Sequence, residues 1–146
     1  MDTMYKWVAA AAGAIISFFT RIPVIMWVLI GAMTLDYFSG LATGLLGVSN
    51  KTDGGKLSSR AAFEGLMRKV MVLLVVLLAV LVDLAVQTGV GVTFNAVTGA
   101  VCLWFIASEG VSILENAAEL GVPIPGVLRK ALEILKTGSE DDQGVA

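Results

Sequence analysis

Residues 70–86 read VMVLLVVLLAVLVDLAV, an apolar run that contains one charged side chain, Asp83. Two similar apolar segments flank this run along the chain, at 23–48 and at 92–114. A helix of about 20 apolar residues is long enough to cross the roughly 30 Å hydrocarbon core of a membrane. The three segments therefore predict an all-α integral membrane protein with three transmembrane helices.

The overall composition also indicates that lipid surrounds much of this chain. Of the 146 residues, 57% are hydrophobic and only 15% are charged, whereas soluble domains carry about 25% charged residues. A chain of this size has too little interior to hide so much apolar surface from water. We therefore expect a single membrane domain over residues 1–137.

A further apolar segment at 5–20 precedes the other three and is bracketed by Lys6 and Arg21. A basic start before a short apolar run also describes a signal peptide, but no small-x-small cleavage site with a polar continuation follows it. As a helix this segment covers about 24 Å, which is short of the hydrocarbon core. It either spans as a fourth helix, with the N-terminus in the cytoplasm, or lies at the interface, with the N-terminus outside.

The connection at 49–69 is rich in basic residues and holds only two acidic ones. Because positively charged loops stay in the cytoplasm, this connection predicts the orientation of the spans. Two spans further along, the C-terminal region is then cytoplasmic as well. We also expect the basic side chains to contact anionic lipid headgroups. These candidate topology determinants are Lys51, Lys56, Arg60, Arg68 and Lys69.

The region after the last span predicts a separate short helix. Residues 121–125, GVPIP, contain two prolines and cannot continue a helix. Residues 126–137 then place apolar side chains on one face and Arg, Lys and Glu on the other. This spacing predicts an amphipathic helix on the cytoplasmic side, lying on the membrane surface or packed on a partner. We expect the polar, acidic residues 138–146 to be disordered.

The residue types that carry most enzyme chemistry are scarce. The chain has no histidine, and its one cysteine, Cys102, lies in an apolar segment. The sequence offers neither a metal-ligand cluster nor a nucleophile with a neighbouring base. The net charge of −2 gives no basic field for nucleic acid. We therefore expect no enzymatic activity, no catalytic, cofactor or metal site, and no nucleic-acid partner.

Several polar residues fall within the predicted spans. Asp36 lies near the middle of its span, where a carboxylate costs about 2.5–3.5 kcal/mol on insertion scales. Such residues face protein or water, so Asp36 either lines an aqueous path or senses membrane energisation through its protonation, or else is a protonated or hydrogen-bonded packing residue. For Asp83 and for Glu109, which has Ser112 beside it, we favour helix-end or helix–helix hydrogen bonding. Asn116 falls at the expected boundary with the interface.

Gly40 and Gly44 lie four residues apart on one face of the second predicted span. In lipid, small residues with this spacing let helices approach closely, because no hydrophobic effect drives the helices together there. The pair is therefore a helix-packing candidate. The contact it marks lies either between subunits or within one subunit.

Five short motifs occur in order along the chain. They are DYFSG at 36–40, GLMRK at 65–69, VD at 82–83, EGVSILEN at 109–116 and GVPIP at 121–125. They resemble the D-x-x-x-G, G-[LI]-x-[RK]-K, V-D, E-x-[VI]-S-I-L-[EK]-N and G-x-P-[VI]-P motifs of the toxin-secretion and phage-lysis holins (phage holin family 4 type). The combination is specific because the last two motifs also keep the family's spacing.

The resemblance implies a phage or prophage protein that accumulates in the bacterial cytoplasmic membrane and assembles with copies of itself. The resulting pore would release an endolysin, which lyses the host cell, or a large toxin. An antiholin is a further partner that the resemblance implies. Two other classes stay open: a small ion-coupled transporter or channel with Asp36 as its coupling carboxylate, and an antiholin-like regulator that makes no hole.

Overall fold

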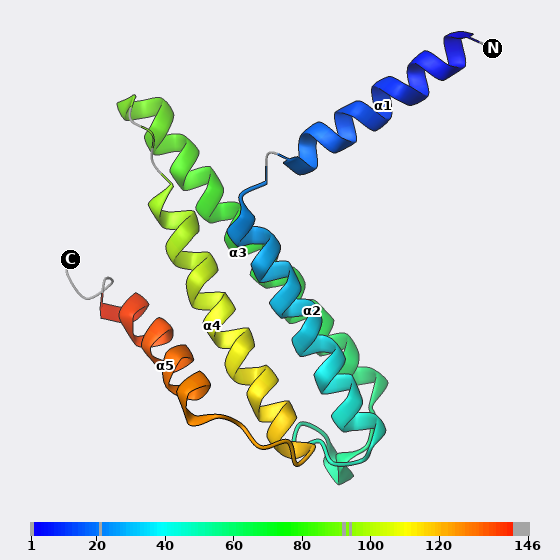
Figure 1. The fold of residues 1–146 in the computed structure, drawn as a ribbon, viewed down its shortest axis with the longest axis vertical. Helices are drawn as coiled ribbons and strands as arrows, with labels where there is room; N and C mark the ends of the chain where they lie inside the picture. Colours follow the sequence, from blue (N-terminus) through cyan, green and yellow to red (C-terminus); the bar gives the residue numbers. More distant parts are fainter. Residues whose placement is uncertain (1, 21, 92, 94, 142–146) are drawn as a thin grey trace.

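Figure 1 shows the computed structural model of the chain, which describes residues 2–20, 22–91, 93 and 95–141. Within these residues there is no strand, and the elements are α1 (Asp2–Thr20), α2 (Val24–Leu45), η1 (Asp53–Gly55), α3 (Ser59–Val90), α4 (Ala96–Glu119) and α5 (Gly126–Asp141). Among the described helices, α2, α3 and α4 are long and apolar enough to cross a membrane. The predicted all-α membrane fold with three spanning helices is confirmed.

α3 begins at Ser59, well before the apolar run at 70–86. The side chain of Ser58 sets this start, because its oxygen accepts a hydrogen bond from the backbone N–H of Ala61 at 3.5 Å, as an N-cap residue does. The loop expected at 49–69 is therefore shorter than predicted, and its last three basic residues lie on the helix. Arg and Lys are good helix formers, so the helix continues past the end of the apolar pattern.

α2 and α4 also differ from the predicted segments at their ends. α2 stops at Leu45 rather than at residue 48, and the chain turns at Gly47, whose φ of +73° is a conformation that glycine adopts without strain. α4 begins at Ala96 and ends at Glu119, later at both ends than the segment predicted at 92–114.

α1 covers the segment for which a fourth span was considered. It is not among the three described helices that are long and apolar enough to cross a membrane. Figure 1 shows it pointing away from the bundle of the other helices. Whether α1 crosses the membrane or lies at its interface, and hence the side of the N-terminus, stays a prediction.

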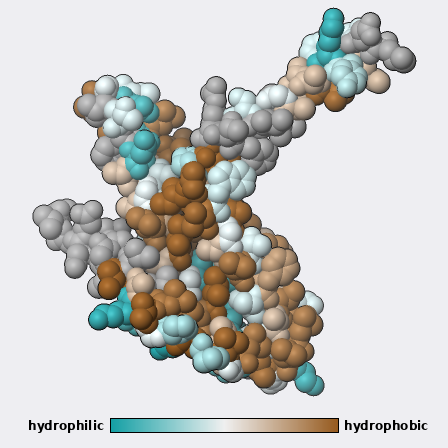
Figure 2. Space-filling view, in the orientation of Figure 1, coloured by the Kyte–Doolittle hydropathy of each residue, from teal (hydrophilic) through white to brown (hydrophobic). Residues whose placement is uncertain are grey.

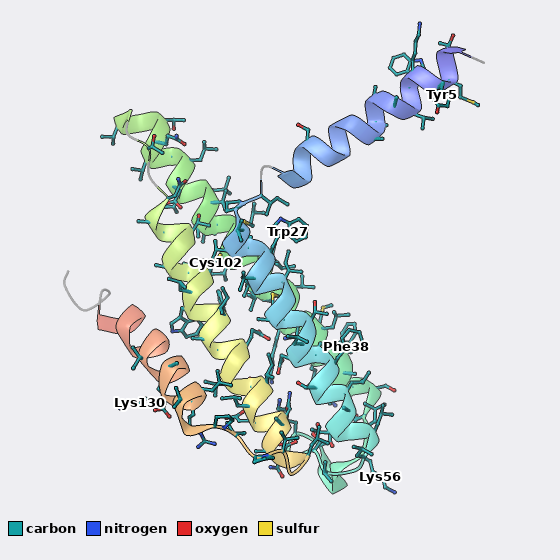
Figure 3. All side chains as sticks on the ribbon, in the orientation of Figure 1. Tyr5, Trp27, Phe38, Lys56, Cys102 and Lys130 are labelled. Atoms are coloured by element: carbon teal, nitrogen blue, oxygen red, sulfur yellow. The ribbon has the colours of Figure 1, made fainter. Side chains whose placement is uncertain are left out.

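α4 is the central helix, with α2, α3 and α5 packed around it (Figure 1). The core shared by the three long helices is small and apolar, and Leu29, Met33, Val76 and Cys102 form it. Cys102 is fully buried between the helices (Figure 3). Most other large apolar side chains stay on the surface, where Figure 2 shows broad hydrophobic areas. Soluble monomers rarely expose so much apolar surface, whereas lipid chains cover it without cost.

α5 follows the predicted break at 121–125 and runs back along α4 (Figure 1). It continues to Asp141, four residues beyond the predicted end at 137; residues 142–146 lie outside the described part of the chain, and the disordered tail stays a prediction. The helix packs on α4 of its own chain, while Val127 and Ile134 remain exposed. These exposed apolar side chains are compatible with the predicted contact between α5 and the membrane surface.

Candidate functional site

Lys69 of α3 lies between two carboxylates that come from the other two spanning helices. Its ammonium group is 2.9 Å from Oδ2 of Asp36 on α2, and it also pairs with Oε2 of Glu109 on α4. The side chains of Asp36, Lys69 and Glu109 are only 17%, 13% and 12% exposed. All three spanning helices are therefore joined at one level by buried charges.

Asn116 extends this cluster by about two turns along α4. Its side chain is fully buried and donates hydrogen bonds to Asp36 Oδ1 at 3.1 Å and to Ser39 Oγ at 2.7 Å. Its carbonyl oxygen accepts a hydrogen bond from Nζ of Lys51 at 2.8 Å. Asn116 thus connects α2, α4 and the α2–α3 loop. We call Asp36, Ser39, Lys51, Lys69, Glu109 and Asn116 the charge cluster.

The loop that carries Lys51 is held in place by glycines. Gly55 has a φ of +72°, and a Cβ on it would clash with the backbone oxygen of Gly47. Its own backbone oxygen accepts a hydrogen bond from the N–H of Ser49 at 3.2 Å. Only glycine permits both this conformation and this approach. The loop therefore folds back on the end of α2 and brings Lys51 against α4.

The cluster contains two carboxylates and two lysines: Lys69 pairs with both carboxylates, whereas Lys51 donates to the amide oxygen of Asn116. Burying one charge without a partner is costly, and removing one member of a buried pair typically destabilises a protein by about 3–5 kcal/mol. Because these side chains lie between packed helices and are at most 17% exposed, little water reaches them to replace a lost partner. The cluster therefore favours one arrangement of α2, α3 and α4, in which Lys69 lies between Asp36 and Glu109.

Gly40 and Gly44 pack within the chain, next to the cluster. A Cβ on Gly40 would lie 3.6 Å from Nδ2 of Asn116, and one on Gly44 would lie 3.2 Å from Cα of Leu57 in the α2–α3 loop. Thr43, between them, is fully buried. Of the two contacts considered for this face, the structure shows packing within one subunit. A contact between subunits at this face stays untested.

Asp83 forms a second buried site, at the opposite end of α4. Its side chain is on α3, is 4% exposed, and accepts hydrogen bonds from the backbone N–H groups of Val97 at 3.2 Å and Thr98 at 2.8 Å. These N–H groups belong to the first turn of α4, where backbone N–H groups have no hydrogen-bond acceptors within the helix. Asn95, the N-cap residue, makes no side-chain capping bond. A carboxylate from the neighbouring helix therefore caps α4.

The remaining predicted residues lie outside both sites. Ser112 is half-buried on α4 and is not one of the side chains that bond in the cluster. Lys56 and Arg68 are exposed, with Lys56 at the loop end of the molecule (Figure 3). Arg60 is also exposed and pairs with Glu64 one turn later, at 2.9 Å. Among the predicted topology determinants, Lys51 and Lys69 are the two that join the cluster.

Sequence reasoning did not place Asn116 or Ser39 in a site. A signal was present, because Glu109 and Asn116 are seven residues apart and so share one face of a helix. Asp36 and Ser39, three apart, share a face of α2 in the same way. Among the described residues no three His, Cys, Asp or Glu side chains are grouped as metal ligands would be. The arrangement is a network of ion pairs and hydrogen bonds that connects helices.

These features define a class: a helical membrane protein of several spans whose helices are joined by a buried charge network. The chain matches the Bacteriophage holin family over residues 13–137. It belongs to the bacteriophage holin family, as its motifs predicted.

The chain is similar in sequence to several bacterial and phage proteins, two of which it matches over nearly their full length. Uncharacterized protein BH0965 of Halalkalibacterium halodurans is 33% identical, covering 93% of this chain and 96% of the relative. Uncharacterized protein Lmo0128 of Listeria monocytogenes is 32% identical, covering 98% and 94%. The "Probable holin" of Bacillus phage phi105 is 39% identical over 60% of each chain. No solved structure matches the chain.

Proposed function

We propose that the chain assembles with copies of itself in the bacterial cytoplasmic membrane and opens a lesion that releases an endolysin or a large toxin. The observation that carries this proposal is the match to the bacteriophage holin family over residues 13–137, which includes all three spanning helices. The similarity to a phage protein named a probable holin supports it.

The charge cluster supplies a physical route from a closed protomer to a lesion. In the single chain, Asp36, Lys69, Glu109 and Asn116 face one another between helices and have little contact with the surroundings. If α2 and α4 move apart, these groups lose their partners and need water, because lipid cannot hydrogen-bond to them. Helices that open together in an assembly would therefore turn polar faces toward an aqueous path.

The distribution of basic residues supports a cytoplasmic location for the α2–α3 loop and for α5. Lys51, Lys56 and Arg60 lie in this loop or in the first turn of α3, at the end of the bundle to which the α4–α5 connection also belongs. Basic residues near span ends are retained in the cytoplasm. The C-terminal helix would then be cytoplasmic.

The ion-coupled transporter has less support. A coupling carboxylate must be able to exchange its partner for an ion or a proton from water. Both carboxylate oxygens of Asp36 are already bonded within the chain, one to Lys69 and the other to Asn116. A regulator that makes no hole could share the same fold and charge cluster, so the expression experiment described next distinguishes it from a holin.

The test is induced expression in bacteria, with and without a co-expressed endolysin that lacks its own export signal. We expect abrupt lysis after a reproducible delay only when the endolysin is present, together with leakage of a cytosolic reporter enzyme. Turbidity and reporter activity in the medium are the two measurements. Normal growth without leakage, with the protein shown to be in the membrane, would contradict a lesion-forming function and favour the regulator.

A further inference from the structure

An open groove runs along α3 on the surface that it shares with α4. Its volume is about 600 Å³, and it is lined by seven of the side chains between Phe63 and Val75 on α3, together with Phe105 on α4. All of the lining residues are apolar except Glu64 and Arg68. Because the groove lies on the outside of two spanning helices, the molecules that meet it in the membrane are lipids or another membrane protein.

Arg68 is the cation that this groove offers to a ligand. Glu64 is already paired with Arg60 at 2.9 Å, so its charge is compensated. Arg68 is exposed and makes no ion pair with another described residue. Its neighbour Lys69 points the other way, into the charge cluster. The groove therefore combines an apolar length with one available guanidinium group.

The position of Arg68 along α3 matches the level of lipid headgroups. From Arg68 to Val90 the helix rises about 33 Å, which is close to the roughly 30 Å thickness of the hydrocarbon core. The only ionisable side chains described between these two residues are Lys69 and Asp83, and both are bonded inside the protein. The helix is therefore long enough to place Arg68 at the phosphate groups of one surface when Val90 lies at the other surface.

We propose that this groove binds an anionic phospholipid of the surrounding bilayer. An acyl chain lies against Met67, Met71 and Phe105, and the headgroup phosphate accepts hydrogen bonds from the guanidinium group of Arg68. Guanidinium binds phosphate in a bidentate manner, and methionine side chains adapt to an irregular partner such as a lipid chain. This inference goes beyond lesion formation, which does not require a bound lipid.

The test uses the full chain purified in detergent. Native mass spectrometry would measure bound phosphatidylglycerol and bound phosphatidylcholine with the same acyl chains. We expect about fivefold tighter binding of phosphatidylglycerol, because the choline cation of phosphatidylcholine offsets the phosphate charge that Arg68 binds. This factor is the effect of one basic side chain close to a headgroup with a net negative charge. Arg68→Gln should remove this preference. Arg129→Gln, the same change at an exposed position on α5, should keep it.

A second variant tests the apolar part of the groove. Val75→Trp fills it without changing any charge, and it should weaken the binding of both lipids to a similar extent. Equal affinity of the wild-type protein for the two lipids, or a preference that survives in Arg68→Gln, would overturn the proposal. So would unchanged lipid binding in Val75→Trp together with a changed oligomer distribution, because a second copy of the chain would then be the molecule that covers the groove.

Discussion

The two ends of α4 each carry a buried carboxylate site, and the two sites are built differently. At the N-terminal end, Asp83 accepts hydrogen bonds from two backbone N–H groups, those of Val97 and Thr98. Toward the other end, Asp36 and Glu109 bind side chains, chiefly the ammonium group of Lys69. The partners of Asp83 are fixed by the helix itself, whereas the partners in the charge cluster sit on flexible side chains of separate helices.

This difference assigns the two sites different mechanical roles. Breaking the Asp83 bonds means exposing the first turn of α4, so α3 and α4 are expected to move as one hairpin. The bonds of Lys69 can break when a helix shifts, without loss of any backbone hydrogen bond. Opening is therefore expected to begin at the charge cluster, with the Asp83 end acting as the hinge.

The largest effect is expected from Lys69→Met, which leaves Asp36 and Glu109 without their shared cation. Loss of one partner from a buried ion pair costs about 3–5 kcal/mol, so we expect a markedly lower melting temperature in detergent. In the lysis assay, a protomer that opens more easily should shorten the delay. Lys56→Met removes the same charge from an exposed loop position and serves as the control.

A triple variant separates the loss of charge pairing from a change in packing. Combining Lys69→Met with Asp36→Asn and Glu109→Gln removes all three charges and keeps similar volumes. Neutral replacements of buried ion networks are often tolerated, so this variant should recover most of the lost stability. Equal melting temperatures for Lys69→Met and Lys56→Met would contradict the role given to the cluster.

The next largest effect is expected from Asn116→Ala, which removes the link from α4 to Ser39 and Lys51. Each buried polar group that loses its partner costs about 1–3 kcal/mol, and Asp36 loses one of its two partners. Asn95→Ala makes the same substitution at an exposed residue without a side-chain capping bond. Thermal unfolding of the two variants is the measurement. Equal melting temperatures for Asn116→Ala and Asn95→Ala would show that Asn116 does not contribute to the stability of the charge cluster.

The spans could be predicted from the sequence, but the cluster could not. Runs of apolar residues are sufficient to predict a helix that is long and apolar enough to cross a membrane, as 70–86 does for α3. Which side chain faces inward depends on helix register: Arg68 and Lys69 are adjacent in the chain, yet a turn of about 100° between them points one outward and the other into the cluster. The sequence placed both residues in the predicted loop at 49–69, where their opposite orientations could not be recognised. Asn116 was missed because its partners are about 65 to 80 residues away.

A smaller and local effect is expected from Asp83→Asn, because asparagine keeps one acceptor oxygen for the two N–H groups. Loss of a helix cap costs about 0.5–2 kcal/mol. Hydrogen exchange at the amides of Val97 and Thr98 should become faster, while exchange near Asn116 stays unchanged. Faster exchange at both ends of α4 would show that the two sites are not independent, and would contradict the hinge.

The smallest effect is expected from a pair of glycine variants on α2, Gly44→Ala and Gly40→Ala. A Cβ at position 44 would lie 3.2 Å from Cα and 3.3 Å from Cδ1 of Leu57, whereas at position 40 its nearest neighbour is Nδ2 of Asn116 at 3.6 Å. Overpacking typically costs about 1–3 kcal/mol, and replacing a helical glycine by alanine contributes up to about 1 kcal/mol in the opposite direction.

Gly44→Ala should therefore lower the melting temperature by a few degrees, and Gly40→Ala should leave it unchanged or raise it slightly. The pair also tests whether this glycine face contacts another subunit. Packing within one chain predicts that neither variant changes the oligomer distribution in detergent, measured by crosslinking. If Gly40→Ala reduced crosslinked oligomers while its melting temperature stayed normal, the face would have to serve a subunit contact. The charge cluster beside it would then lie at an interface between protomers, not only between the helices of one.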